Sequence, residues 1–342
     1  MEENKQHKTA LPETEPIPSA QAPEALLDIR GLRVEYHTDE DVVYAVNGLD
    51  LTIGKGESLG LVGETGAGKT TTALSVLRLI ADPPGKIMGG EIWFEGEDML
   101  QAKPARLREI RGSKISVIFQ DPMTSLNPVY SVGDQIAEVI HQHEKCSKEE
   151  GRRKAGDMLE MVGIPRARYD EYPHQFSGGM KQRVVIAMSI ACSPELILAD
   201  EPTTALDVTI QAQVLELMNE LKEKLRTSLL LITHDLGVVA QVCDRVAIMY
   251  AGEIVESGTI AEVFDHPHHP YTIGLFGSIP SLDETAEKLK PIQGQMPDPT
   301  ELPEGCAFAP RCPYATGACR TRKPEMTGVG GTQMVRCLAH QG

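Results

Sequence analysis

The residues with the clearest chemical use form the glycine-rich segment GETGAGKT at positions 63–70. It has the spacing of a phosphate-binding loop, and it lies between an apolar run and a helix-like run at 71–80. Glycines let successive backbone N–H groups turn toward phosphate oxygens, and the dipole of the following helix favours anions. Lys69 can reach the β- and γ-phosphates of ATP, and the Thr70 hydroxyl can hold Mg²⁺. The predicted nucleotide contacts are Gly63, Glu64, Thr65, Gly66, Ala67, Gly68, Lys69, Thr70 and Thr71.

A pair of acidic residues follows the apolar run at 196–199. Asp200 and Glu201 lie where a buried parallel strand would end, the edge at which doubly wound sheets bind ligands. Asp200 is expected to help hold Mg²⁺, and Glu201 to polarise an attacking water as a general base. Two acids at a strand end are more often a solvated turn, and a glycine-rich loop alone can be a simple turn. Together they predict the two halves of one nucleotide site.

The segment FSGGMKQR at 176–183 predicts a second anion site. Ser177, Gly178 and Gly179 are small residues where a helical apolar pattern begins, and such helix starts bind anions. One helix start is enough to bind the phosphates of one ATP from one side, so this chain has a second helix start that its own ATP does not need.

On these segments the chain resembles the ATPase subunits of ABC transporters. Residues 176–180 are similar to the family's signature loop, usually LSGGQ. Phe176 replaces one apolar residue by another, whereas Met180 lacks the side-chain amide and is not assigned as a ligand. The resemblance implies that two ATPase chains stack head to tail, each signature loop closing on the γ-phosphate bound by the other chain.

Four more positions match that family in order. Gln120 matches the glutamine that reaches Mg²⁺ and the attacking water and senses the membrane subunit. Asp207 matches the loop that crosses the dimer interface, and His234 matches the histidine that contacts the γ-phosphate. Tyr36 matches the aromatic residue that stacks on adenine. Tyr44 is nearby, and a tyrosine in a strand often packs in the core instead, so stacking and packing are equally expected for Tyr36.

Composition excludes several other classes of protein. The 342 residues carry a formal charge of −16, from 33 basic and 49 acidic residues, which argues against a nucleic-acid partner. No run approaches 18 uncharged apolar residues, so no membrane span is expected. The polar, proline-rich residues 1–24 lack the apolar region of a secretory signal and are expected to be a disordered tail. A cytoplasmic protein is expected from these features, and the resemblance implies that it is peripheral, on the cytoplasmic face of the cell membrane.

The expected fold class is α/β, an ABC-type P-loop NTPase core with an N-terminal antiparallel β segment. The expected ATPase domain covers residues 25–260 and includes a helical subdomain at about 121–179. Residues 261–342 are expected to form a small Cys-rich C-terminal extension. Only one phosphate loop is present, so an active head-to-tail dimer needs a second chain.

The C-terminal extension narrows the resemblance to importer ATPases for oligopeptides and dipeptides. Segments 120–136, 266–272 and 305–320 are similar to that subfamily. The resemblance implies ATP hydrolysis that energises peptide import, with a related but different ATPase chain, two membrane permease subunits and an extracytoplasmic peptide-binding protein. Another cargo, such as nickel or oligosaccharide, remains an alternative. A soluble non-transport ABC ATPase is the other alternative, but it would usually carry two cassettes or a coiled-coil insertion. The three histidines of HPHHPYT predict a solvated turn rather than a metal site.

Four cysteines gather near the C-terminus with the spacing C-x5-C-x6-C-x17-C. Disulfides are disfavoured in a reducing cytosol, and structural zinc sites usually have tighter spacings. An iron–sulfur cluster takes four thiolates with varied spacing, and basic residues surround these cysteines. Similar C-terminal regions in peptide-importer ATPases hold a [4Fe–4S] cluster, so the resemblance favours this cluster, with a structural role, over Zn²⁺ and over plain thiols. The residues concerned are Cys306, Cys312, Cys319 and Cys337.

Overall fold

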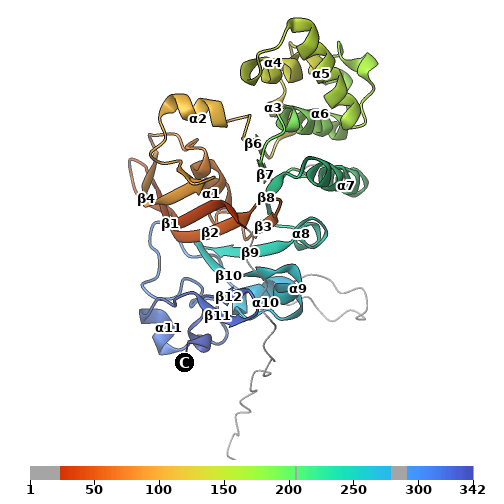
Figure 1. The fold of residues 1–342 in the computed structure, drawn as a ribbon. Helices are drawn as coiled ribbons and strands as arrows, with labels where there is room; N and C mark the ends of the chain where they lie inside the picture. Colours follow the sequence, from red (N-terminus) through yellow and green to blue (C-terminus); the bar gives the residue numbers. More distant parts are fainter. Residues whose placement is uncertain (1–23, 205, 279–290, 342) are drawn as a thin grey trace, which may run out of the picture.

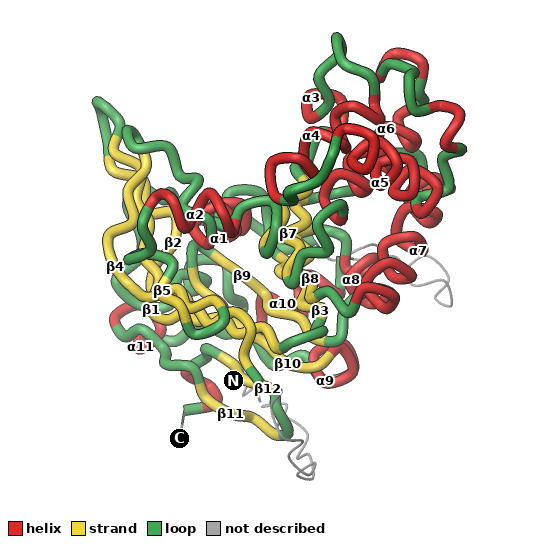
Figure 2. Tube along the Cα trace, turned by 45° about the horizontal axis from the view of Figure 1, so that its top comes forward, coloured by secondary structure: helices red, strands yellow, loops and turns green. Residues whose placement is uncertain are grey.

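The computed structural model describes residues 24–204, 206–278 and 291–341. The expected disordered tail, residues 1–24, lies outside the described residues except for its last residue. The described chain contains two sheets, a helical lobe and a C-terminal extension (Figures 1 and 2). This arrangement confirms the expected α/β class with an N-terminal antiparallel segment. Among the described helices, none has the length and apolar character that a membrane crossing requires.

The first sheet is antiparallel and has the strand order β2-β1-β4-β5. Alternate side chains of its long strands are buried, as expected for a sheet with one face on the core. Its strands are β1 (Ala25–His37), β2 (Val42–Gly54), β4 (Gly85–Phe94) and β5 (Glu97–Asp98).

The second sheet has the order β11-β12-β10-β9-β3-β8-β7-β6. The five strands from β9 to β6 are parallel, and β10, β12 and β11 continue the sheet in antiparallel pairing. Its strands are β3 (Ser58–Val62), β6 (Ile115–Ile118), β7 (Leu196–Asp200), β8 (Ser228–Thr233), β9 (Arg245–Tyr250), β10 (Glu253–Thr259), β11 (Thr327–Gly330) and β12 (Gln333–Val335).

Helices cover the second sheet and build the lobe above it (Figure 1). The α-helices are α1 (Lys69–Val76), α2 (Pro104–Ile110), α3 (Pro122–Ser125), α4 (Val132–His143), α5 (Lys148–Met161), α6 (Gly178–Ile190), α7 (Val208–Leu225), α8 (Leu236–Val242), α9 (Ile260–Asp265), α10 (Pro270–Phe276) and α11 (Gly317–Thr321). Short 3₁₀ turns are η1 (Arg166–Arg168), η2 (Pro173–Gln175) and η3 (Leu338–His340).

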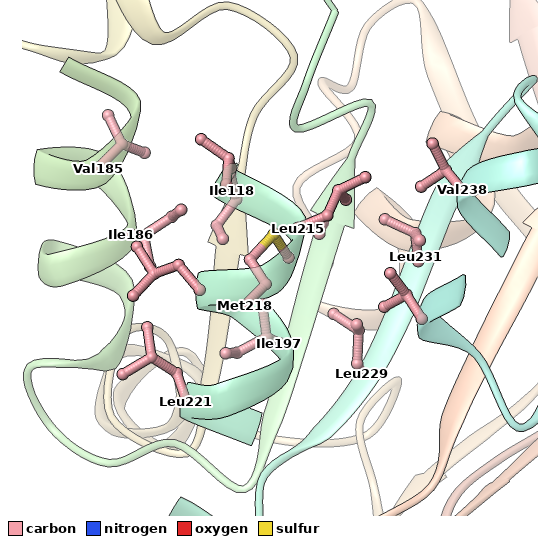
Figure 3. Close-up of a cluster of buried hydrophobic side chains, with 14 of the residues drawn as sticks. Ile118, Val185, Ile186, Ile197, Leu215, Met218, Leu221, Leu229, Leu231 and Val238 are labelled. Atoms are coloured by element: carbon pink, nitrogen blue, oxygen red, sulfur yellow. The ribbon is translucent and has the colours of Figure 1, made fainter. Parts of the chain in front are cut away.

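One hydrophobic core of the described chain lies between the parallel strands and helices α6, α7 and α8. A second joins the antiparallel sheet and α1 to the parallel strands. Strands β3, β7 and β8 are buried along their whole length, which explains their continuous apolar runs. Figure 3 shows part of the first core, in which helix side chains pack on the sheet. The labelled residues are Ile118, Val185, Ile186, Ile197, Leu215, Met218, Leu221, Leu229, Leu231 and Val238.

The helical lobe is built from α3 to α6. Helices α4 and α5 both begin after a serine whose hydroxyl accepts a backbone N–H three residues later: Ser131 from Asp134 and Ser147 from Glu150, each at 3.2 Å. Acidic residues in the first turn of each helix favour the same starting points. Both helices lie within residues 121–179, where the sequence predicts helical structure.

Two local predictions were wrong. The helix after the phosphate loop ends at Val76 rather than at residue 80, because Arg78 takes a left-handed backbone conformation with φ of +50°. The histidine-rich segment is not simply a solvated turn, because His269 is only 1% exposed and caps α10. Its Nδ1 accepts a hydrogen bond from the backbone N–H of Tyr271 at 3.1 Å.

Candidate nucleotide-binding site

The phosphate loop joins the end of β3 to the start of α1 and has no room for side chains at two of its glycines. A Cβ atom on Gly63 would lie 2.2 Å from the carbonyl oxygen of Met249. Gly68 has φ of +102°, and a Cβ there would lie 2.3 Å from the carbonyl oxygen of Ala45. The glycines therefore let the loop pass close to neighbouring backbone, with its N–H groups at the start of α1.

Lys69 lies over this loop. Its Nζ donates to the carbonyl oxygens of Gly63 at 2.7 Å and Glu64 at 2.9 Å. Burial lowers the pKa of Lys69, and the carboxylates of Glu201 and Asp200 oppose that effect. The ammonium group is thus held near the loop and the acidic pair, where a phosphate would meet it.

Asp200 ends β7 and is 7% exposed. Burial raises the pKa of its carboxyl group, and a hydrogen bond from the Thr70 side chain partly offsets this. The two predicted Mg²⁺ ligands from β7 and α1 are therefore in contact. Oxygen donors of this kind suit Mg²⁺, so the residues fit the metal that the sequence predicts.

Glu201 is where three separate segments of the chain meet. Its Oε2 accepts hydrogen bonds from Gln120 Nε2 at 2.8 Å and Thr204 Oγ1 at 2.9 Å. Its Oε1 lies 3.1 Å from His234 Nδ1. Burial alone would raise the pKa of Glu201, but the hydrogen bonds from His234 and Thr204 outweigh it and lower the pKa.

The backbone of Glu201 also departs from the usual range, with φ of +45°. Non-glycine residues rarely adopt this conformation, and those that do gather at functional sites. Its N–H donates to the carbonyl oxygen of Ile232 at 2.8 Å, which fixes the turn after β7. Thr204 was missed by the sequence analysis. The only signal for it is a hydroxyl three residues after the acid, a spacing common in turns.

Tyr36 lies beside the first turn of α1. Its hydroxyl is 3.2 Å from Thr71 Oγ1, so β1 brings this ring next to the phosphate loop. Tyr44, the alternative, is 38% exposed on β2. The role of Tyr36 in adenine stacking stays a prediction.

The signature segment, residues 176–180, lies in the helical lobe, away from the phosphate loop. Ser177 caps α6 and accepts the N–H of Met180 at 3.4 Å, so Gly178 and Gly179 open a helix as expected. Helix α6 belongs to the helical lobe, apart from α1 in both views (Figures 1 and 2). Asp207 caps α7, accepting the N–H of Ile210 at 3.0 Å. The chain therefore does not bring its own signature segment to its own phosphate loop.

The four C-terminal cysteines lie near one another without forming a metal centre. All four are free thiols, and the N–H of Cys306 donates to the carbonyl oxygen of Cys319 at 2.8 Å. In the part of the chain that the structure describes, no three or more His, Cys, Asp or Glu side chains are grouped to bind a metal ion. Burial raises the pKa of the Cys306 thiol to about 11. The arrangement does not support the predicted [4Fe–4S] cluster, or zinc in its place.

Two families match the chain. Residues 46–204 match the family described as ABC transporter, and residues 255–319 match the family described as oligopeptide/dipeptide transporter, C-terminal region. The first range contains the phosphate loop, the signature segment and the acidic pair. The second contains α9, α10 and the first three of the four C-terminal cysteines.

Similar proteins occur in Bacillus subtilis (strain 168). The oligopeptide transport ATP-binding protein AppD is 49% identical over 318 residues, covering 92% of this chain and 97% of the relative. The oligopeptide transport ATP-binding protein OppD is 51% identical over 314 residues, covering 91% and 88%. The dipeptide transport ATP-binding protein DppD is 48% identical over 316 residues, covering 92% and 94%.

Two solved structures of ABC cassettes are similar in fold to this chain. The ATP-binding cassette MJ0796, as a dimer in a post-hydrolysis state bound to ADP and Pi, has a TM-score of 0.61 and 28% identity, covering 68% of this chain and 98% of that one. CbiO1 of Clostridium perfringens, part of the ABC transporter complex CbiONQ, has a TM-score of 0.61 and 27% identity, covering 71% and 91%. The chain therefore belongs to the ABC transporter ATP-binding proteins, in the branch that carries the oligopeptide/dipeptide transporter C-terminal region.

Proposed function

We propose that this chain is the ATP-hydrolysing subunit of an ABC importer for di- or oligopeptides. The observation that carries the proposal is the meeting of Gln120, Glu201 and His234 beside a phosphate loop. This arrangement suits hydrolysis of a phosphoanhydride, because a carboxylate, an amide and an imidazole that contact one another can together orient an attacking water. The names of AppD, OppD and DppD support the peptide cargo.

In this proposal the phosphate loop binds the phosphates of ATP through its backbone N–H groups and Lys69. Thr70, Asp200 and Gln120 would hold Mg²⁺, which supplies positive charge against the developing phosphate charge. Glu201 would orient the attacking water and accept its proton. His234, with its side chain 64% exposed, is free to leave Glu201 and contact the γ-phosphate.

A second ATPase chain completes the site. The support is that Ser177, Gly178 and Gly179 lie in the helical lobe and one phosphate loop is present in the sequence. We propose a related but different ATPase chain, two membrane permease subunits and an extracytoplasmic peptide-binding protein as partners. The chain would attach to the cytoplasmic face of the cell membrane.

We propose that residues 25–260 form the ATPase domain, that residues 121–179 form its helical subdomain, and that residues 261–342 form the C-terminal extension.

Co-purification and uptake test this function. The chain is isolated from membranes, its partner chains are identified, and the complex is reconstituted in vesicles with the binding protein. ATP-dependent uptake of labelled di- or oligopeptides is expected, and it should be lost in Lys69→Ala. Uptake of nickel or an oligosaccharide in place of peptide would change the cargo, and an active ATPase that never associates with membrane subunits would overturn the transport role.

A thiolate site at the four cysteines is a secondary proposal. The observation behind it is the backbone contact between Cys306 and Cys319, which brings two of the four cysteine residues together. A metal would have to draw the thiols together from their described positions. Iron and zinc analysis of anaerobically purified protein tests the proposal. Metal that is lost in Cys337→Ser would support it, and metal-free protein with all thiols titratable would reject it.

A further inference from the structure

We propose that the C-terminal extension positions the phosphate loop through Arg311 and Tyr271, so that the extension sets the affinity for ATP. This inference rests on the proposed function, because it takes the loop to be the ATP site. Both residues hold Glu64, the second residue of the loop, one by its side chain and the other by its backbone.

Arg311 is joined to the loop by an ion pair that is buried on the arginine side. Its Nη1 lies 3.0 Å from both carboxylate oxygens of Glu64, and its side chain is only 6% exposed. Its Nε donates to the carbonyl oxygen of Gln293 at 3.1 Å, and Nη1 lies 3.3 Å from the hydroxyl of Tyr250. The guanidinium is thus fixed on several sides, which makes it a rigid partner for the carboxylate.

Tyr271 holds the backbone of the same residue. Its hydroxyl accepts a hydrogen bond from the N–H of Glu64 at 3.1 Å, and its side chain is fully buried. The ring packs against Tyr250 and Phe308, with centroids 4.6 and 5.5 Å away. The tyrosine therefore has little freedom to follow the loop if the loop moves.

The extension itself is anchored by a buried carboxylate. Glu256 on β10 accepts the backbone N–H groups of His268 at 2.7 Å and His269 at 2.9 Å. His269 in turn accepts the N–H of Tyr271 at 3.1 Å. A continuous set of contacts therefore runs from the central sheet through α10 to the phosphate loop.

A third contact covers the turn of the loop. The methyl group of Met296 would lie 3.2 Å from a Cβ atom on Gly66, so this side chain rests on the glycine. Nearby, the N–H of Tyr44 donates to the carbonyl oxygen of Pro299 at 2.9 Å, which joins the extension to β2. The extension thus reaches the nucleotide site at several points. Of the contacts described here, the one made by Arg311 is an ion pair, and those of Tyr271, Met296 and Pro299 are uncharged.

The ion pair has an electrostatic consequence. Glu64 carries a negative charge in a loop that must bind a triphosphate, and it also acts on Lys69. Without Arg311 the carboxylate would repel the phosphates or compete with them for Lys69. Removal of Arg311 should therefore weaken ATP binding, and neutralising Glu64 should restore it.

The test measures the Kd for ATP and the KM and kcat of the assembled transporter for a four-variant cycle. Arg311→Gln should raise Kd and KM about tenfold while kcat changes less than about twofold. A tenfold effect lies within the usual range of interaction energies between contacting residues. Glu64→Gln combined with Arg311→Gln should recover most of the loss. Arg322→Gln is the matched control, because Arg322 is an exposed arginine of the same extension, and it should leave Kd unchanged.

Tyr271→Phe separates the two contacts. It keeps the ring and removes the hydroxyl, so it should raise Kd a few-fold, and Glu64→Gln should not rescue it because the bond is to the backbone. If Arg311→Gln does not fold, Arg311→Lys and Tyr271→Phe carry the test. Folded Arg311 variants that bind ATP like Arg322→Gln would overturn the proposal, and a loss that Glu64→Gln does not relieve would overturn the electrostatic role of Arg311. Wild-type protein that binds no ATP would instead overturn the proposed function.

Discussion

Glu201 is held by three side chains, and this makes its role testable at the scale of single residues. Gln120, Thr204 and His234 all contact its carboxylate. A general base must present a lone pair to water, and a carboxylate has about four acceptor sites. Among the contacts that the structure describes, Oε1 has only the one with His234, so it keeps a lone pair for the attacking water.

We expect Glu201→Gln to keep ATP binding and to slow hydrolysis by about 10²- to 10⁴-fold, the usual contribution of a positioned base. The amide keeps the shape of the side chain but cannot accept the proton. Single-turnover hydrolysis and nucleotide binding, measured in the assembled complex, check this. Glu216→Gln, an exposed change on α7, is the control. Turnover near the wild-type rate in Glu201→Gln would exclude the base role.

The pKa of Glu201 also predicts a pH dependence. The pKa lies below its usual 4.5, so the carboxylate is already ionised above about pH 5. Its contribution as a base is therefore constant from about pH 5 to 8 and falls only as the pH drops through the lowered pKa. We expect kcat/KM to show no Glu201-dependent acid limb within that range. An acid limb near pH 6 that disappears in Glu201→Gln would contradict the lowered pKa.

At this scale the sequence predicts residues that share a contiguous motif. Lys69 and Asp200 follow from local patterns whose chemistry is self-contained. The meeting of Gln120 and His234 on Glu201 joins positions 81 and 33 residues apart, so only the family resemblance predicted it. No local pattern predicts the contact of Arg311 with the phosphate loop, because its partner Glu64 is 247 residues away in the sequence.

At the scale of elements, the two glycines that open α6 differ in their surroundings. A Cβ on Gly178 would meet nothing closer than Leu206 Cδ2 at 3.8 Å. A Cβ on Gly179 would lie 2.3 Å from Ile210 Cγ2, on the first turn of α7. The close approach of α6 to α7 therefore depends on the second glycine and not on the first.

We expect Gly179→Ala to lower the free energy of unfolding by about 1–3 kcal/mol, the usual effect of overpacking, and Gly178→Ala to change it little. Ile210→Ala in the Gly179→Ala background should recover part of the loss, because it removes the clashing methyl. Chemical denaturation of these three variants and of the wild type measures this. Equal stability of the two glycine variants would contradict the described packing of α6 on α7.

The elements themselves were largely predictable, and the exceptions have local causes. Strands with continuous apolar runs and helices with serine caps appear where the patterns indicate. The early end of α1, before Arg78, could not be predicted from residue type, since arginine has no preference for a positive φ. The burial of His269 depends on Glu256 and Phe308 from distant segments, so the polar local sequence suggested solvent.

At the scale of the whole molecule, the separation of Ser177 from Lys69 predicts a dependence on assembly. We expect the isolated chain to hydrolyse ATP slowly, with a rate per chain that rises when the partner ATPase is added. Ser177→Arg should abolish hydrolysis at the partner's nucleotide and leave ATP binding at Lys69 intact, whereas Gln142→Arg, an exposed change in the same lobe, should do neither. Full activity of a dilute monomer would exclude this arrangement.

Strand β12 pairs with the side of β10 that faces away from β9, with Glu256 opposite Val335. A cassette shortened after Thr259 would leave the N–H and C=O groups of β10 unpaired along a largely buried strand. Unpaired edges of this kind recruit strands from other copies, so the shortened protein should self-associate. We therefore expect the extension to limit self-association of the ATPase, and light scattering of the shortened and complete chains would reveal the difference.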